Sequence, residues 1–243
     1  MLHYQPQINH RTQAIEGAEA LLRWQHPHKG TIGPAAFMDV LEESGLILQA
    51  GKWVLLSSCS FLSRLLLDNA IDANCFSLSV NISPRQFRQT SFVGDVLHAI
   101  STYNIPPQCI KLEITEGIVI QDVADTIDKM NVLRERGVHF AIDDFGTGYS
   151  SLSYLKQLPV DVLKIDQSFV RDCTHNPNDA EIIRAIIAIA SSLRMDFIAE
   201  GVETPEQLAF LHELGCDHYQ GYLFSPPVDE HAFRLLLNAR QHD

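Results

Sequence analysis

Short apolar runs and helical patterns alternate along almost the whole chain. Alternation of this kind favours βα units and a mainly parallel sheet, so the predicted fold class is α/β. Eight strand-like runs predict a sheet that closes on itself as a barrel. The predicted strands are Tyr4 to Ile8, Ile15 to Leu22, Phe76 to Ile82, Ile110 to Thr115, His139 to Asp143, Val160 to Ile165, Phe197 to Glu200 and a short one near His218.

The first two predicted strands are separated only by the polar segment Asn9 to Gln13. This connection has hairpin length and is too short for a helical crossover, so the first strand is predicted to run antiparallel to the second. Between the second and third strands the pattern predicts two helices, Pro34 to Glu43 and Lys52 to Asn69. The second of these carries apolar residues at helical spacing.

Two segments carry the signature of a helix start: Ser83-Pro84-Arg85-Gln86 and Thr204-Pro205-Glu206-Gln207. Each combines a capping hydroxyl, a proline at the first helical position and a glutamine three residues after the cap. Asn81 and Glu200 stand just before these segments. Because helix amino termini are positive, these starts favour phosphate at the same mouth of the barrel.

Polar residues recur where the apolar runs reach their carboxyl ends. Parallel strands in a barrel deliver these ends to one face, so residues far apart in sequence converge there. Five carboxylates in one pocket would repel each other unless they took up protons or bound cations, and hard divalent cations prefer oxygen ligands. The array predicts bound magnesium or manganese, with candidate ligands Glu19, Asn81, Glu113, Asp143, Asp144 and Glu200.

Two of these positions have local features that support a metal site. Strand alternation places Glu113 on the face opposite Leu112 and Ile114, toward the barrel axis, although a surface strand residue is the plainer alternative. Asp143-Asp144 ends an apolar strand and runs into a glycine-containing loop. Adjacent acids can serve a pair of ions, as in phosphoryl hydrolases, whereas the plainer alternative is an Asp-rich turn.

Lys164 is a cation inside an apolar strand, where burial is costly unless acidic partners offset it. It forms a buried salt bridge, or holds an attacking water and stabilises charge on a phosphate, or does both. Gln220 ends the last predicted strand and is a weaker candidate, which could simply bond to a water or a loop backbone. Glu116 and Glu203 are better explained as a loop anchor and a structural residue.

The whole-chain properties limit the possible functions. The 243 residues suit one large domain, 1–243, because no linker or low-complexity stretch divides them. The net charge of -12 argues against a general DNA-binding or other nucleic-acid-binding protein. Five scattered cysteines without metal-clip spacing indicate a reducing compartment. Neither a signal peptide nor a membrane segment is predicted, so the chain is expected to be soluble and cytoplasmic.

The motifs taken together resemble the EAL-type cyclic-di-GMP phosphodiesterase family, from Tyr4-Gln5-Pro6 to Phe224-Ser225-Pro226-Pro227. The resemblance covers essentially the whole chain, and its name-giving triplet is followed here by Leu22-Arg23-Trp24. The motifs that carry it are Glu19-Ala20-Leu21, Asn81-Ile82-Ser83, Glu113-Ile114-Thr115-Glu116, Asp143-Asp144-Phe145-Gly146, Lys164-Ile165-Asp166, Glu200-Gly201-Val202-Glu203 and Gln220-Gly221-Tyr222.

This resemblance implies a modified TIM (β/α)8 barrel with an antiparallel first strand. It implies that Glu19, Asn81, Glu113 and Asp143 hold one Mg²⁺ or Mn²⁺, and that Asp143, Asp144 and Glu200 hold the second. Ca²⁺ is expected to inhibit. The resemblance further implies the remaining roles: Lys164 and Gln220 order the attacking water, Glu116 braces the loop from Asp144 to Leu152, and Gln5 and Arg23 contact the dinucleotide.

The implied reaction is two-metal, in-line hydrolysis of cyclic-di-GMP to linear pGpG. A homodimer is also implied, and the chain could be one domain of a larger sensor protein. Two other functions stay open: a receptor module that binds cyclic-di-GMP without cleaving it, and a two-metal barrel hydrolase for another phosphodiester. Only the resemblance names the substrate, because a fold does not determine one.

Overall fold

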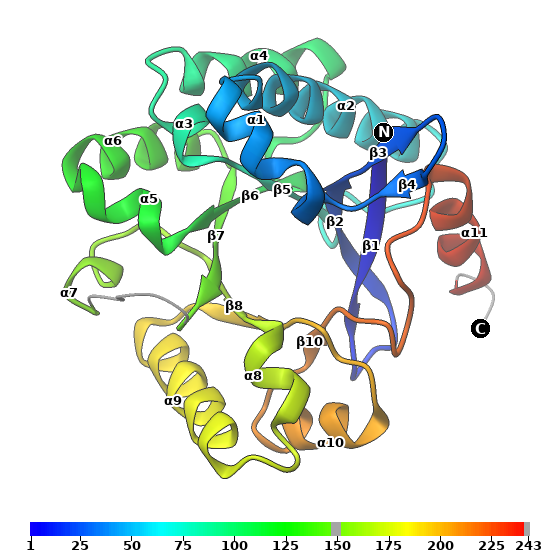
Figure 1. The fold of residues 1–243 in the computed structure, drawn as a ribbon, viewed down its shortest axis with the longest axis vertical. Helices are drawn as coiled ribbons and strands as arrows, with labels where there is room; N and C mark the ends of the chain where they lie inside the picture. The colour runs from blue at the N-terminus through cyan, green and yellow to red at the C-terminus, as the bar shows by residue number, and fades with distance from the viewer. Residues whose placement is uncertain (147–151, 241–243) are drawn as a thin grey trace.

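The computed structural model describes residues 1–146 and 152–240. Among these residues, eight strands close into a barrel with helices around it (Figure 1). Around the barrel the strands follow the order β1, β10, β9, β8, β7, β6, β5, β2. The predicted fold class is confirmed: an α/β barrel of the (β/α)8 type with an antiparallel first strand.

The antiparallel pairing is confined to the first strand. β1 runs antiparallel to both neighbours, β2 and β10, while the other pairs around the barrel are parallel. In the β1–β2 register Gln5 lies opposite Glu19. The barrel strands are β1 Leu2–Asn9, β2 Ile15–Leu22, β5 Ser77–Asn81, β6 Ile110–Thr115, β7 His139–Phe145, β8 Val162–Ile165, β9 Asp196–Ala199 and β10 His218–Tyr219.

The helices lie outside the barrel, with α2 and α4 along one side and α8, α9 and α10 along the opposite side of the view in Figure 1. Two 3₁₀ turns, Pro34–Ala36 and Pro107–Cys109, also occur. The described helices are α1 Met38–Ser44, α2 Ile47–Leu67, α3 Pro84–Phe87, α4 Phe92–Tyr103, α5 Glu116–Gln121, α6 Val123–Arg134, α7 Leu152–Leu155, α8 Gln167–Asp172, α9 Pro177–Leu193, α10 Pro205–Glu213 and α11 Glu230–Arg240.

The predicted strands match the observed ones to within two residues at each end, but the region before α2 differs from its prediction. A small hairpin, β3 Trp24–His26 with β4 Gly30–Ile32, is not signalled by the apolar pattern because it is short and exposed. The predicted helix from Pro34 to Glu43 is instead a 3₁₀ turn followed by α1. Gly45, in the left-handed conformation, caps α1, and α2 starts two residues later.

Both predicted helix starts are confirmed. The Ser83 side chain accepts a hydrogen bond from the Gln86 backbone N–H, and Pro84 is the first residue of α3. Thr204 and Gln207 form a reciprocal capping box at the start of α10. These caps satisfy backbone donors that helix starts leave free, so they place the two helices beside the ends of β5 and β9.

Side-chain alternation divides the barrel into an apolar outer surface and a mostly polar interior. On β6, Ile110, Leu112 and Ile114 are fully buried in the main hydrophobic cluster, under the helices. The alternate residues of the strands face the barrel axis. There a second, small apolar cluster forms from Ala141, Val162 and Ile198, each two residues before a charged residue of the site described below.

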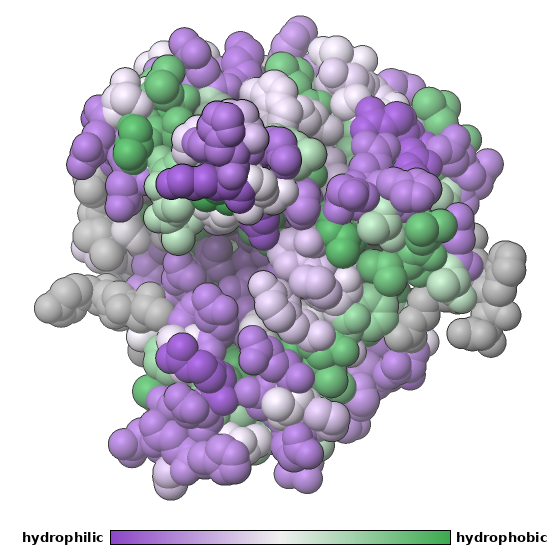
Figure 2. Space-filling model, turned by 45° about the vertical axis from the view of Figure 1, so that its right-hand side comes forward, coloured by the Kyte–Doolittle hydropathy of each residue, from purple (hydrophilic) through white to green (hydrophobic). Residues whose placement is uncertain are grey.

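The surface seen in Figure 2 is largely hydrophilic, with separate apolar patches and a central recess whose walls are hydrophilic. In the described part of the chain, no single helix has the length and apolar character needed to cross a bilayer. The pair α1 and α2 meets that test jointly, by length and composition alone, with a bend of 118° between the two helices.

Candidate active site

All the residues predicted as metal ligands come to one mouth of the barrel. Glu19 lies on β2, Asn81 ends β5, Glu113 lies on β6, and Asp143 and Asp144 lie near the end of β7. Glu200 directly follows β9. This mouth is formed by the carboxyl ends of the parallel strands, where active sites of α/β barrels are built.

Lys164 of β8 lies at the centre of this group. Its Nζ is 2.5 Å from Glu113 Oε2, 2.7 Å from Glu200 Oε1 and 3.0 Å from Asp143 Oδ1. Glu19 Oε2 lies 3.5 Å from the same Nζ. Four carboxylates, three on strands and one directly after β9, therefore share one ammonium group, and Lys164 is 1% exposed. The buried salt bridge that the sequence suggests for Lys164 is present, and it is a network of four carboxylates around one ammonium group.

Amide side chains complete the network. Asn81 Nδ2 donates to Glu19 Oε1 at 2.6 Å, and Gln220 Nε2 donates to Glu19 Oε2 at 2.6 Å. The same Gln220 nitrogen donates to Glu200 Oε1 at 2.9 Å, and its carbonyl accepts from Gln7 at 2.9 Å. Gln220 thus links two carboxylates and is held in turn by β1. Buried polar groups satisfied in this way rigidify a site.

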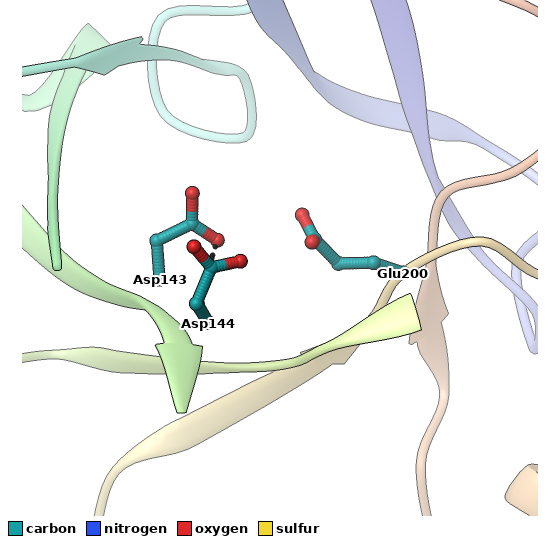
Figure 3. A group of neighbouring side chains, drawn as sticks. All are labelled: Asp143, Asp144 and Glu200. Carbon is teal, nitrogen blue, oxygen red and sulfur yellow. Dashed lines mark hydrogen bonds between the residues drawn. The ribbon is translucent and has the colours of Figure 1, made fainter. Parts of the chain in front are cut away.

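A β-bulge brings Asp143 and Asp144 to the same pocket. In a regular strand these neighbours would face opposite sides of the sheet. The β7–β8 register shifts between Ile142 and Phe145, and Asp144 adopts a positive φ of 54°. Bulges often re-aim side chains in this way beside active sites. Figure 3 shows the outcome: the Glu200 carboxylate points toward those of Asp143 and Asp144.

These three carboxylates form a group that could hold a metal ion, because one oxygen from each lies within 4.8 Å of the others. Asp144 is solvent-accessible, while Asp143 and Glu200 are half-buried. A deeper set lies beneath them, in which Glu19 and Glu113 are buried. The candidate ligands thus span the pocket from its floor to its opening.

The electrostatics of the pocket favour additional positive charge. Burial, opposed by Lys164 and reinforced by Glu19 and Asp143, raises the pKa of Glu113 to about 8. Burial also raises the pKa of Glu200 well above its ordinary value, and burial with Asp143 and Asp166 raises the pKa of Asp144 to about 6. Burial of Glu19 is outweighed by Lys164, Gln220 and Asn81, so its pKa is lowered. One ammonium does not neutralise four carboxylates.

The donor set fits a hard divalent cation. It consists of carboxylate and amide oxygens, the ligands that magnesium and manganese prefer. Glu113 Oε1 is buried and has no hydrogen-bond partner among the described residues. A buried carboxylate oxygen without a partner is costly, and a cation at this position would satisfy it. The residues present therefore fit the metal that the sequence predicts.

Glu116 lies just beyond β6, at the start of α5, and its Oε1 accepts a hydrogen bond from the Gly146 N–H at 2.9 Å. This contact ties the segment after the Asp143–Asp144 bulge to the end of β6. The contact is compatible with the prediction that Glu116 braces the loop from Asp144 to Leu152, which stays a prediction. Residues 147–151 of that loop lie outside the described residues.

The two predicted dinucleotide contacts lie beside the carboxylates. Gln5 is buried, opposite Glu19 in the β1–β2 register, and its Nε2 is 3.5 Å from the Ser225 carbonyl. Arg23 donates to the Leu22 carbonyl at 2.9 Å. Burial lowers the pKa of Arg23, and the charges of Tyr222 and Glu19 oppose this effect.

A mostly apolar hollow of about 310 Å³ opens next to the carboxylates. Its lining includes Leu22, Met38 and Val54, from β2, α1 and α2, together with Asp143 and Asp144. The hollow therefore joins an apolar wall to the acidic pocket. Such a combination suits a ligand with a ring system attached to a phosphate.

Sequence reasoning missed Asp166, which is buried at the mouth and caps α8 by accepting from the Ser168 N–H at 2.9 Å. Its signal was available, because Asp166 stands two positions after Lys164 and thus on the same side of the chain. Gln7, the partner of Gln220, was also missed. Strand alternation places Gln7 on the same face of β1 as Gln5, but its hydrogen-bond partner Gln220 is distant in sequence.

The architecture and the site define this protein as a closed α/β barrel with a polar, acid-lined pocket at the carboxyl ends of its strands. The chain belongs to the EAL domain family, whose model matches residues 1–227. It is 42% identical over 242 residues to the cyclic di-GMP phosphodiesterase NbdA of Pseudomonas aeruginosa, an alignment that covers 100% of this chain and 30% of NbdA.

Solved structures agree with this assignment. The PaMucR phosphodiesterase in complex with c-di-GMP superposes with a TM-score of 0.91 and 40% identity, covering 96% of this chain and 93% of that one. The EAL enzyme Bd1971, in its cAMP- and cyclic-di-GMP-bound form, gives a TM-score of 0.93 and 39% identity, covering 98% and 64%. The chain spans about a third of the length of the curated relatives it matches.

Proposed function

We propose that this chain hydrolyses cyclic-di-GMP to linear pGpG with the help of two Mg²⁺ or Mn²⁺ ions. In the proposed reaction the oxygen of a water forms a bond to one phosphodiester phosphorus, and the bond from that phosphorus to the 3′ oxygen breaks. The departing oxygen takes up a proton and becomes a 3′ hydroxyl. Cleavage of one of the two diesters opens the ring.

The proposed ligands form two sets. Glu19, Asn81, Glu113 and Asp143 would hold one ion, and Asp143, Asp144 and Glu200 would hold the other. A bound ion pair would lower the pKa of the attacking water and stabilise the entering and departing oxygens. Asp143 belongs to both sets, which agrees with its contact to the central lysine and its place beside Asp144 and Glu200.

Lys164 and Gln220 are proposed to order the attacking water, with Glu19 and Glu200 acting as catalytic carboxylates. The Lys164 ammonium can donate to a water or to a charged phosphate oxygen. Gln220 already donates to Glu19 and Glu200, so its contribution includes the placement of these two side chains. Glu116 supports the Asp143–Asp144 bulge through Gly146.

Gln5 and Arg23 are proposed to contact the dinucleotide. The Arg23 guanidinium offers a planar set of donors that matches a phosphate. Its charge interacts with that of Glu19, which supports a role of the arginine in the same pocket. The adjoining apolar hollow would accept a base.

The observation that carries this proposal is the convergence of four carboxylates on Lys164. Inward-facing charges of this density lower stability, so their presence indicates that they serve a function. The names of the relatives supply the substrate: NbdA is a cyclic di-GMP phosphodiesterase, and the PaMucR phosphodiesterase was solved with c-di-GMP.

The proposal is tested by chromatography of cyclic-di-GMP after incubation with the purified chain. We expect pGpG with Mg²⁺ or Mn²⁺ and little product with Ca²⁺, which is expected to inhibit. Glu19→Ala and Asp143→Ala should abolish product formation, whereas Glu206→Ala, at an exposed position on α10, should leave the rate unchanged. Near-normal rates in the Glu19 or Asp143 variants would refute the site assignment.

The same experiment separates the enzyme from a receptor. Tight binding of intact cyclic-di-GMP without pGpG in any of the three metals would favour a receptor module. Hydrolysis of other phosphodiesters at equal rates would favour a hydrolase of different specificity.

We further propose that the domain acts in the cytoplasm as a homodimer within a larger sensor protein. Sedimentation measurements of the full-length protein would test the homodimer.

A further inference from the structure

The opposite mouth of the barrel contains a second polar cavity, at the amino-terminal ends of the parallel strands. Ser77, Lys111, Val162 and Asp196 line both of the adjoining hollows found there, of about 370 Å³ and 180 Å³. Each of these residues lies within the first two positions of its strand. We call the larger of the two the basal hollow; its charged lining is Lys111, Arg134, His139, Asp161, Arg194 and Asp196.

Lys111 is the feature of the basal hollow that calls for an explanation. Its neighbours Ile110 and Leu112 are buried outside the barrel, so Lys111 faces the barrel interior. It is half-buried, and within residues 1–146 and 152–240 its ammonium has neither a hydrogen bond nor an ion pair within 4.0 Å. A cation held away from water without a partner is costly.

Among the described residues, carboxylates act on this cation only from beyond 4.0 Å. Burial lowers the pKa of Lys111, and the charges of Glu113, Asp196 and Asp161 oppose this effect without cancelling it. Asp161 already has close partners, because it lies 3.3 Å from Arg134 and 3.3 Å from His139 and accepts from the Phe140 N–H at 3.0 Å. Arg194, like Lys111, has no ion pair in the described part of the chain. Asp196 is the remaining acidic group, so the basal hollow keeps a positive balance in a chain whose net charge is -12.

We propose that the basal hollow is a binding site for a small phosphate-bearing anion, with Lys111 at its floor and Arg194 at its rim. Two separate cations suit the double negative charge of a phosphate better than a single carboxylate. The volume of about 370 Å³ lies within the range of small-molecule sites, about 300–1,000 Å³. This site takes no part in the proposed hydrolysis, because its lining at the amino-terminal ends of the strands includes none of the proposed metal ligands.

The test is a titration of the metal-free, ¹⁵N-labelled chain with inorganic phosphate, followed by amide chemical shifts. We expect saturable shifts at Ser77, Lys111, Val162 and Asp196, without matching shifts at Glu19 or Asp144. A second arm uses glycerol 3-phosphate, and tighter binding there identifies a phosphate monoester as the ligand. Non-saturating shifts, or shifts confined to the carboxylate pocket, would overturn the proposal.

Variants that remove either a positive or a negative charge from the basal hollow make the test more specific. Lys111→Met keeps a long side chain and should weaken phosphate binding at least tenfold, and Arg194→Gln should weaken it by a smaller factor. Asp196→Asn removes a negative charge that acts on Lys111 and should tighten binding. Lys29→Met, at an exposed position in the β3–β4 hairpin, is the control and should bind as the unmodified chain does. Unchanged affinity in both the Lys111 and the Arg194 variant would contradict the proposal.

Discussion

Lys164 Nζ lies 2.5 Å from Glu113 Oε2, and the two side chains reach each other across the barrel interior from β8 and β6. Three further carboxylates contact the same ammonium. This relationship connects the barrel's stability with its proposed chemistry, because the lysine offsets part of the charge that the carboxylates bring into the interior.

Replacement of this lysine should destabilise the metal-free protein. Lys164→Met leaves four buried or half-buried carboxylates without their shared cation, so we expect a loss of about 3–5 kcal/mol in the free energy of unfolding. Added Mg²⁺ or Mn²⁺ should restore part of this loss, because the ions bind only the folded form. Urea unfolding with and without metal measures both effects.

Lys52→Met provides the matched control. Lys52 also pairs with a carboxylate, at 2.8 Å from Asp95, but on the exposed surface. Its replacement should change stability by less than about 1 kcal/mol and should not respond to metal. Equal losses in the two lysine variants would show that the network around Lys164 does not stabilise the barrel.

The bulge at Asp144 gives a second prediction. Asp144→Asn should keep the fold, because asparagine also tolerates the left-handed conformation observed there. It should weaken Mn²⁺ binding at least tenfold, because a charged ligand is lost. Asp144→Val should in addition lower thermal stability, since a β-branched residue is strained at a positive φ. Calorimetric titration and thermal unfolding separate the two effects, and equal metal affinity in Asp144→Asn would exclude this residue as a ligand.

Glu116 should act through position, not through direct contact with the substrate. Glu116→Ala removes the acceptor for the Gly146 N–H, so we expect kcat for cyclic-di-GMP to fall at least about tenfold and metal affinity to fall with it. Glu116→Gln retains an acceptor oxygen and should recover part of both values. A pair of variants with identical kinetics would argue against this hydrogen bond as the cause.

The raised pKa of Asp144, about 6, predicts a pH dependence of metal binding. A metal must displace the proton of Asp144, so Mn²⁺ affinity should rise by up to about tenfold per pH unit below pH 6. Above pH 6 the component of the pH dependence that is due to Asp144 should level off. The component should be absent in Asp144→Asn. Affinities measured by titration between pH 5 and pH 8 provide the test, and a flat profile in the unmodified chain would contradict it.

The same pKa has the opposite effect on the metal-free fold. Because the pKa of Asp144 is raised above the ordinary value of about 3.9, its contribution to stability is fully present below about pH 4. That contribution is lost as the pH rises through about 6. Metal-free Asp144→Asn should therefore gain stability relative to the unmodified chain as the pH increases from 4 to 7.

The sequence carried strong information on strands and on the mouth residues. Alternation on β6 placed Glu113 inside the barrel, and the short Asn9–Gln13 connection predicted the antiparallel first strand. These signals are reliable because both depend on local geometry: the two-residue period of a strand and the length of a hairpin. The metal-ligand candidates then followed from the common face of the strand ends.

Other features depend on contacts between distant segments, so local patterns did not reveal them. The shared ammonium at Lys164 requires four strands to be in register, and the hydrogen bond from Gln7 to Gln220 joins the two ends of the chain. The bulge at Asp143–Asp144 appears only against its neighbour β8. The β3–β4 hairpin is short and exposed, and therefore lacks a hydrophobic period.

The small apolar layer of Ala141, Val162 and Ile198 has a further consequence. It lies in the barrel interior two residues before Asp143, Lys164 and Glu200, so apolar side chains separate the carboxylate pocket from the basal hollow on the side of β7, β8 and β9. On the side of β1 a polar contact joins the two regions, because Gln7 lines the smaller hollow at the amino-terminal mouth and donates to Gln220 in the carboxylate pocket. The barrel interior is therefore asymmetric, with an apolar part at β7, β8 and β9 and a polar part beside β1.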